Sequence, residues 1–99
     1  MPAYIIAAVT PTNPEAYAEY AKLAGPAIQQ HGGRYLVRGG KLEILEGAWP
    51  HARTVVIEFP TIEQAKALYR SLEYQAARTK RLGAADFNMI VVEGVTPAP

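Results

Sequence analysis

The sequence contains no cysteine, and its two histidines, His31 and His51, lie far apart. Disulfides, thiolate metal ligands and thiol nucleophiles are therefore excluded, and none of the usual spacings of zinc ligands is present. The glycine pairs at residues 32–33 and 39–40 lack the spacing of nucleotide-binding loops, and no serine nucleophile motif occurs. We therefore expect no metal and no cofactor, and a cytoplasmic location fits the lack of cysteine best.

The sequence also has little excess charge of either sign, because 10 basic side chains stand against 9 acidic ones in 99 residues. Such a balance produces no net field that would attract nucleic acid or an anionic membrane surface. The apolar run near the start is too short for a membrane span and lacks the basic flank of a secretory signal. We expect neither nucleic acid nor a membrane as a partner.

Apolar side chains, in contrast, are plentiful and make up 49% of the chain. A chain of this length and composition can build one compact core, so residues 1–95 are predicted to form a single domain. Residues 96–99 read Thr-Pro-Ala-Pro, and nothing in that segment can pack or pair. We expect a disordered tail there.

Four apolar, partly β-branched segments predict strands. These strands are expected at residues 4–9, 34–38, 54–59 and 87–92. Residues 42–45 also read as extended, and two glycines, Gly39 and Gly40, separate them from the second strand. The glycines are compatible with a tight turn or with a bulge, and we favour a single bent strand that continues through them.

Capping residues mark the starts of the helices. One helix should begin at Asn13, which can cap the first turn, and end at Gly32, which tolerates the left-handed conformation. A second should begin at Thr61, which forms a capping box with Gln64, and Ser71 can cap a further short helical segment.

The order strand, helix, strand, strand, helix, strand matches a ferredoxin-like α+β fold, an antiparallel sheet with two helices on one face. Alternate residues of a strand point to opposite faces, yet both faces look apolar here, with Met89 and Val91 on one face of the last strand and Ile90 and Val92 on the other. The helices can cover only one face, and a monomer rarely leaves so large an apolar patch in water. A second copy of the same sheet is the natural cover, which predicts a homodimer.

Four segments carry a specific resemblance that spans nearly the whole chain. They read Ala-Ile-Gln-Gln-His-Gly-Gly-Arg-Tyr-Leu-Val-Arg-Gly-Gly at 27–40, Leu-Glu-Gly at 45–47, Val-Ile-Glu-Phe-Pro at 56–60 and Ser-Leu-Glu-Tyr-Gln at 71–75. In these segments the chain resembles a bacterial family known only as domain of unknown function 1330. The resemblance implies a dimeric α/β barrel, in which two ferredoxin-like subunits pack sheet to sheet, and it implies no function.

Two residues are candidates for catalysis. His31 stands at the end of the first helix beside two glycines, and histidine can act as a general acid or base near neutral pH. The plainer interpretation, a structural histidine that interacts favourably with the helix dipole, carries more weight. Tyr74 would act as a hydrogen-bond donor.

Three charged residues and one tyrosine are candidates for ligand binding. Arg34 and Arg38 lie four positions apart on one strand and should share a face, where they could hold a carboxylate or phosphate or stand as solvated charges. Glu58 interrupts an apolar strand and needs either a ligand or a structural ion pair with one of these arginines. Tyr69, with Tyr74 and Trp49, could line a pocket for a flat apolar ligand, although tyrosines at helical spacing are more often core.

Two functions are compatible with these residues. The first is a homodimeric protein that binds a small organic or anionic ligand in a cleft between the sheet and the helices. The alternative, implied by relatives of the dimeric α/β barrels, is a cofactor-free monooxygenase or isomerase that acts on an aromatic or polyketide-like substrate. His31 would then be the base, Arg38 the anion holder and Tyr74 a hydrogen-bond donor.

Overall fold

The protein is described here by a computed structural model, which covers residues 1–95. The predicted tail at residues 96–99 lies outside the described residues. The strands are β1 (Ala3–Pro11), β2 (Arg34–Arg38), β3 (Arg53–Phe59) and β4 (Ala85–Glu93), and the helices are α1 (Pro14–Gln30), α2 (Ile62–Arg70) and α3 (Leu72–Arg81). Within this part of the chain, no helix has both the length and the apolar composition needed to cross a bilayer.

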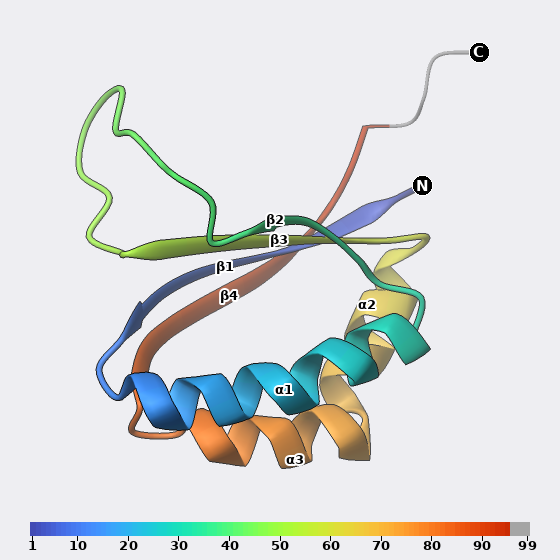
Figure 1. Ribbon diagram of the computed structural model, residues 1–99. Coiled ribbons are helices and arrows are strands. Elements are labelled where there is room, and N and C mark those ends of the chain that lie inside the picture. The colour runs from blue at the N-terminus through green and yellow to red at the C-terminus, as the bar shows by residue number, and fades with distance from the viewer. Residues whose placement is uncertain (96–99) are drawn as a thin grey trace.

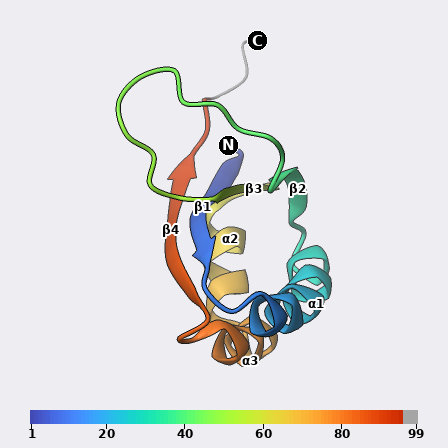
Figure 2. The ribbon, with the colours of Figure 1, turned by 60° about the vertical axis from the view of Figure 1, so that its left-hand side comes forward.

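The four strands form one antiparallel sheet in the order β2-β3-β1-β4. All three helices lie on one side of this sheet, and α1 packs beside α3 (Figures 1 and 2). The predicted ferredoxin-like α+β fold is therefore confirmed. Three helices cover this face: the two expected helices, α1 and α2, and α3, which is the further helical segment expected after Ser71.

The side chains predicted to cap the helices do so. The Asn13 side-chain oxygen accepts a hydrogen bond from the backbone N–H of Ala16, and the Thr61 hydroxyl accepts one from that of Gln64. The Ser71 hydroxyl accepts a hydrogen bond from the backbone N–H of Tyr74. Each cap supplies an acceptor to a first-turn donor that has no partner within its helix.

The core lies between the helices and the covered face of the sheet. In β1 the residues Ala3, Ile5, Ala7 and Val9 are buried and alternate with residues that are only half-buried. The helices supply the opposing layer, which consists chiefly of Tyr20, Ala24, Ile28, Leu68, Tyr74 and Ala77. This alternation fixes which residues of each strand face the helices and which face outward.

The outward face of the sheet is largely apolar and exposed in the single chain. Ile6 in β1 lies between Val56 of β3 and Ile90 of β4 in the register of the sheet. The Ile90 side chain is 59% exposed, and Val92 is exposed two positions further along the same strand. The predicted pattern of two apolar faces, of which the helices cover one, is present in the structure.

The segment after β2 differs from the prediction. The strand ends at Arg38, and residues 40–52 form no strand, so the expected continuation of β2 through residues 42–45 is wrong. Gly39 takes a φ of +72°, a left-handed turn that carries the chain out of the plane of the sheet. The segment then forms a long loop on the side away from the helices (Figure 1).

Candidate functional site

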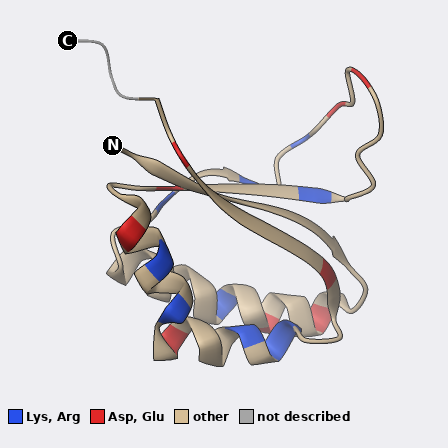
Figure 3. Cartoon of the chain, turned by 180° about the vertical axis from the view of Figure 1, so that it is seen from behind, with Lys and Arg blue, Asp and Glu red and all other residues tan. Residues whose placement is uncertain are grey.

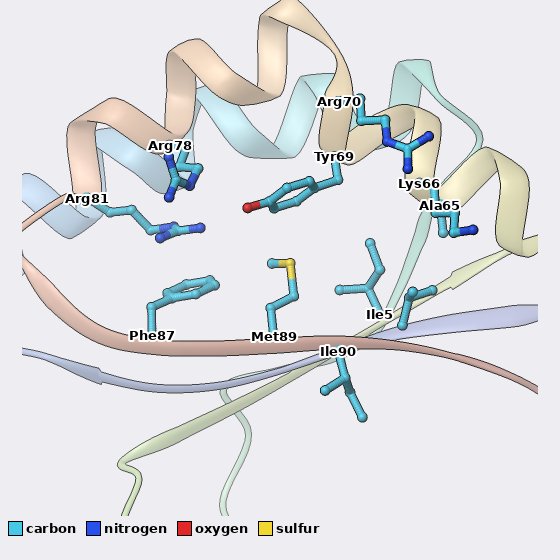
Figure 4. A pocket seen from close by; sticks show the side chains of 11 residues that line it. Ile5, Ala65, Lys66, Tyr69, Arg70, Arg78, Arg81, Phe87, Met89 and Ile90 are labelled. Carbon is cyan, nitrogen blue, oxygen red and sulfur yellow. The ribbon is translucent and has the colours of Figure 1, made fainter.

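A pocket of about 360 Å³ lies between the helical layer and β4, the strand at one edge of the sheet. Its lining residues are Ile5, Ala65, Lys66, Tyr69, Arg70, Arg78, Arg81, Phe87, Met89, Ile90 and Val91. In Figure 4, Phe87 and Met89 rise from the sheet toward Tyr69, which descends from α2. The Ile90 side chain points to the opposite side of the sheet. The pocket is therefore a slot with the Tyr69 ring on the helix side and the side chains of Phe87 and Met89 on the sheet side.

Arg81 is the buried charge at this pocket. Its exposed fraction is only 7%, because α3 places it on the same face as the buried residues Tyr74 and Ala77, at positions i, i+3 and i+7. The guanidinium carbon lies 3.6 Å from the centre of the Phe87 ring, and one Nη donates a hydrogen bond of 3.4 Å to the Tyr74 hydroxyl. Its Nε is buried without a partner.

Among residues 1–95, no acidic side chain forms an ion pair with Arg81. The neighbouring polar groups are the hydroxyls of Tyr74 and Tyr20, which lie 2.8 Å apart in the core. Burial, helped by the nearby Tyr74, raises the pKa of Tyr20 far above the ordinary value for tyrosine. The Tyr20 hydroxyl therefore stays neutral and does not cancel the charge of the guanidinium.

Three further cations surround the pocket. Lys66 and Arg70 lie one turn apart on α2, and Arg78 precedes Arg81 by three residues on α3. Four of the ten basic residues of the chain thus line one pocket, whose lining includes no aspartate or glutamate. Elsewhere in the described part of the chain, no group of three or more acidic or histidine side chains is arranged to hold a metal ion.

The residues that the sequence predicted to form a functional site lie at separate places in the structure. His31 ends α1, outside the pocket, with its Nε2 3.8 Å from a carboxylate oxygen of Glu73. Glu58 lies on the outward face of the sheet, where Arg34 binds it at 2.7 Å and the Tyr4 hydroxyl lies at 3.4 Å. This is the structural ion pair that the sequence left open as an alternative.

Arg34 and Arg38 do not share a face, so that prediction is wrong. A β-bulge between Tyr35 and Val37 adds one residue to β2 and reverses the alternation beyond it. Arg34 therefore faces outward, whereas Arg38 turns to the helix side and lies 4.5 Å over the Tyr35 ring. The two guanidinium groups cannot hold one anion together.

Of the three aromatic candidates, only Tyr69 lines the pocket. Tyr74 is buried behind Arg81, and Trp49 lies on the long loop, where its indole N–H donates to the Thr54 hydroxyl. Sequence reasoning missed the basic residues of α2 and α3. One signal was available: Arg81 continues the apolar stripe of α3, so a charge falls on a face that must be buried.

The protein has an antiparallel sheet of this strand order with helices on one face, which defines a small ferredoxin-like α+β protein. Its pocket, between the helices and the sheet, is lined by basic and apolar residues. The chain belongs to the family described as Domain of unknown function (DUF1330), which it matches over residues 2–95. Among proteins with curated descriptions, none is significantly similar to it.

Several solved structures share the fold. A protein of unknown function from Rhodopseudomonas palustris has a TM-score of 0.75 at 24% identity, with 97% of this chain and 84% of that chain covered. A dimeric ferredoxin-like protein of unknown function from Thermobifida fusca has a TM-score of 0.65 at 14% identity, with coverage of 93% and 90%. SnoaB, a cofactor-independent oxygenase from Streptomyces nogalater, has a TM-score of 0.64 at 9% identity, with coverage of 99% and 97%.

Proposed function

We propose that the protein binds a small, flat organic anion in the pocket between α2, α3 and β4. The observation that carries this proposal is Arg81, which is 7% exposed, lines the pocket and has no acidic partner among the described residues. A buried charge without a counter-ion costs on the order of several kcal/mol. Phe87 and Tyr74 offset part of that cost, and a ligand carboxylate would supply the missing charge.

The apolar part of the ligand follows from the walls of the slot. Tyr69 lies opposite Phe87 and Met89 across the pocket (Figure 4). Aromatic rings and methionine sulfur pack favourably against the face or edge of another ring. A flat aromatic body would therefore fill the slot while its acidic group reaches Arg81.

The proposed binding protein is a homodimer that packs through the outward sheet face. The support is the outward apolar row of Ile6 and Val56, both half-buried, and the exposed Ile90, together with the dimeric state named for the Thermobifida fusca neighbour. An isologous contact would cover this row on both copies with one surface. Apart from Ile90, the residues that line the pocket lie on the helix side of the sheet, so the same contact would leave most of this lining within each subunit.

The binding proposal is tested by calorimetric titration with naphthoate and with its uncharged amide, naphthamide. The wild type should bind the acid about tenfold more tightly than the amide or better, because a charge-assisted hydrogen bond contributes about 1.5–3 kcal/mol. Arg81→Met should remove this preference. Arg38→Met is the matched control, since Arg38 also stacks on an aromatic ring but lies outside the pocket, and it should keep the preference.

Because Arg81 is buried, its replacement can also disturb folding. If Arg81→Met does not fold, the preference for an anion is judged from the wild type alone, by comparing its affinity for naphthoate with its affinity for naphthamide. If the wild type bound both compounds with equal affinity, the proposal that the ligand is an anion would be wrong. If it bound neither compound at millimolar concentration, the whole binding proposal would be overturned.

The alternative is a cofactor-free monooxygenase or isomerase acting on an aromatic substrate. Its support is the fold shared with SnoaB. The geometry supports it less, because the pocket lining contains no histidine or carboxylate to act as a base and His31 lies outside that lining. Oxygen uptake with a naphthohydroquinone distinguishes the two: turnover that His31→Ala abolishes would favour the enzyme, and no uptake above the uncatalysed rate would favour the binding protein.

A further inference from the structure

The cations of the pocket form two groups rather than one. In Figure 4, Arg78 and Arg81 lie at one end of the slot, and Lys66 and Arg70 lie at the other. Tyr69 and Met89 occupy the space between them. The two groups also come from different helices, α3 and α2, and Figure 3 shows basic residues along both.

Neither group has an acidic partner within the described residues. The ion pairs of lysine and arginine found there belong to Lys22, Arg34 and Lys41, all outside the pocket. The whole chain carries a net charge of only +1, so the concentration of positive charge at this pocket is local. Like charges held around a low-dielectric slot repel one another, and a bound anion relieves that repulsion at whichever end it occupies.

The apolar middle of the slot separates the two ends. Ile5, Met89 and Val91 offer no hydrogen bond that could hold a polar group there. The Tyr69 hydroxyl, the one polar group of that ring, points toward the end with Arg78 and Arg81 (Figure 4). A ligand with a single acidic group would satisfy the end that contains the buried Arg81 and leave Lys66 and Arg70 unused.

We propose that the ligand is a flat dianion, with one acidic group at each end of an apolar ring system. The inference rests on the proposed binding function and adds a second recognition point to it. Arg81 and Arg78 hold the first acidic group through their guanidinium forks, and Lys66 and Arg70 hold the second at the more exposed end. An aromatic dicarboxylate is the simplest compound of this class.

The test compares naphthoate with two diacids of different length, a naphthalene dicarboxylate and a biphenyl dicarboxylate, each with its acids at opposite ends. Calorimetry on the wild type should give at least one diacid an affinity about tenfold above that of naphthoate, since two exposed charge pairs contribute about that much. The double variant Lys66→Gln with Arg70→Gln should abolish this advantage.

The matched control is the double variant Lys22→Gln with Lys80→Gln, which removes the same charge from exposed helical positions outside the pocket. It should keep the advantage of the diacid. The inference is overturned if naphthoate binds and neither diacid binds more tightly, and the proposed binding function then still stands. It is also overturned if the diacid advantage survives in the Lys66 and Arg70 variant. If none of the three acids binds, both proposals fail.

Discussion

Gly33 occupies a position where a side chain has no room. A Cβ built there would lie 2.6 Å from Ile28 Cγ2 and 2.8 Å from Phe59 Cζ, and both of these side chains are buried in the core. Gly33→Ala should lower the free energy of unfolding by about 1–3 kcal/mol, because a packed core yields to an added methyl group only by straining its neighbours. Urea denaturation followed by circular dichroism measures the change.

Gly40→Ala provides the comparison for Gly33. A Cβ at Gly40 would meet no atom within 4 Å, so this variant should stay within about 0.5 kcal/mol of the wild type. If both variants lost the same stability, the crowding seen at Gly33 would not be the cause.

At the scale of the elements, Ser71 is the single residue that joins α2 to α3. Its hydroxyl accepts from the backbone N–H of Tyr74 at 3.1 Å and donates to the carbonyl of Leu68 at 2.6 Å. One side chain thus satisfies an end of each helix. Pocket residues lie on both sides of this junction, Tyr69 and Arg70 before it and Arg78 and Arg81 after it.

Ser71→Ala should therefore lower the unfolding free energy by about 1 kcal/mol, the usual cost of losing an N-cap. Thermal denaturation would record this as a lower midpoint, whereas Ser71→Thr retains a hydroxyl and should stay close to the wild type. Naphthoate binding to Ser71→Ala should weaken as well, if the junction positions the pocket. An alanine variant as stable as the threonine variant would contradict the role assigned to this hydroxyl.

At the scale of the whole molecule, the outward face of the sheet is the surface that the fold leaves without a cover. Ile90 is 59% exposed on the edge strand β4, beside the half-buried Ile6 of β1. Ile90→Asp should turn the proposed dimer into a monomer, because a carboxylate would have to be buried in an apolar contact. Sedimentation velocity at micromolar concentration measures the mass directly.

Leu72→Asp is the control for this substitution. Leu72 is 87% exposed in the helical layer, so the same change of charge falls outside the proposed contact and should leave the dimer intact. A wild-type protein that sediments with the mass of one chain would exclude the sheet-to-sheet dimer.

The helices and strands could be read from the sequence because their signals are local. Asn13, Thr61 and Ser71 cap helices in the structure as their sequence neighbours suggested. Alternating apolar residues marked the strands, and the order of the elements limited the fold to a few arrangements. The exception is the segment after Arg38, where residues 42–45 have an apolar pattern but no neighbouring strand to pair with.

The candidate site was less predictable, because its residues meet only through packing. The bulge in β2 sends Arg34 and Arg38 to opposite faces, and spacing along the chain does not reveal a bulge. The Nε2 of His31 lies 3.8 Å from a carboxylate oxygen of Glu73, which is 42 positions away in the sequence.

The sequence by itself determined the elements, their order and the apolar character of both sheet faces, since each depends on residues within a few positions of one another. The tertiary structure alone decided which charged groups share a pocket. Lys66, Arg70, Arg78 and Arg81 gather at one slot because α2 and α3 both lie over β4, and Arg81 is buried there beside Phe87. Two properties distinguish an arginine that could bind a ligand from a solvated one: burial, and the lack of an acidic ion-pair partner, which for Arg81 holds among residues 1–95. Both depend on what surrounds the side chain in three dimensions, so the sequence alone does not reveal them.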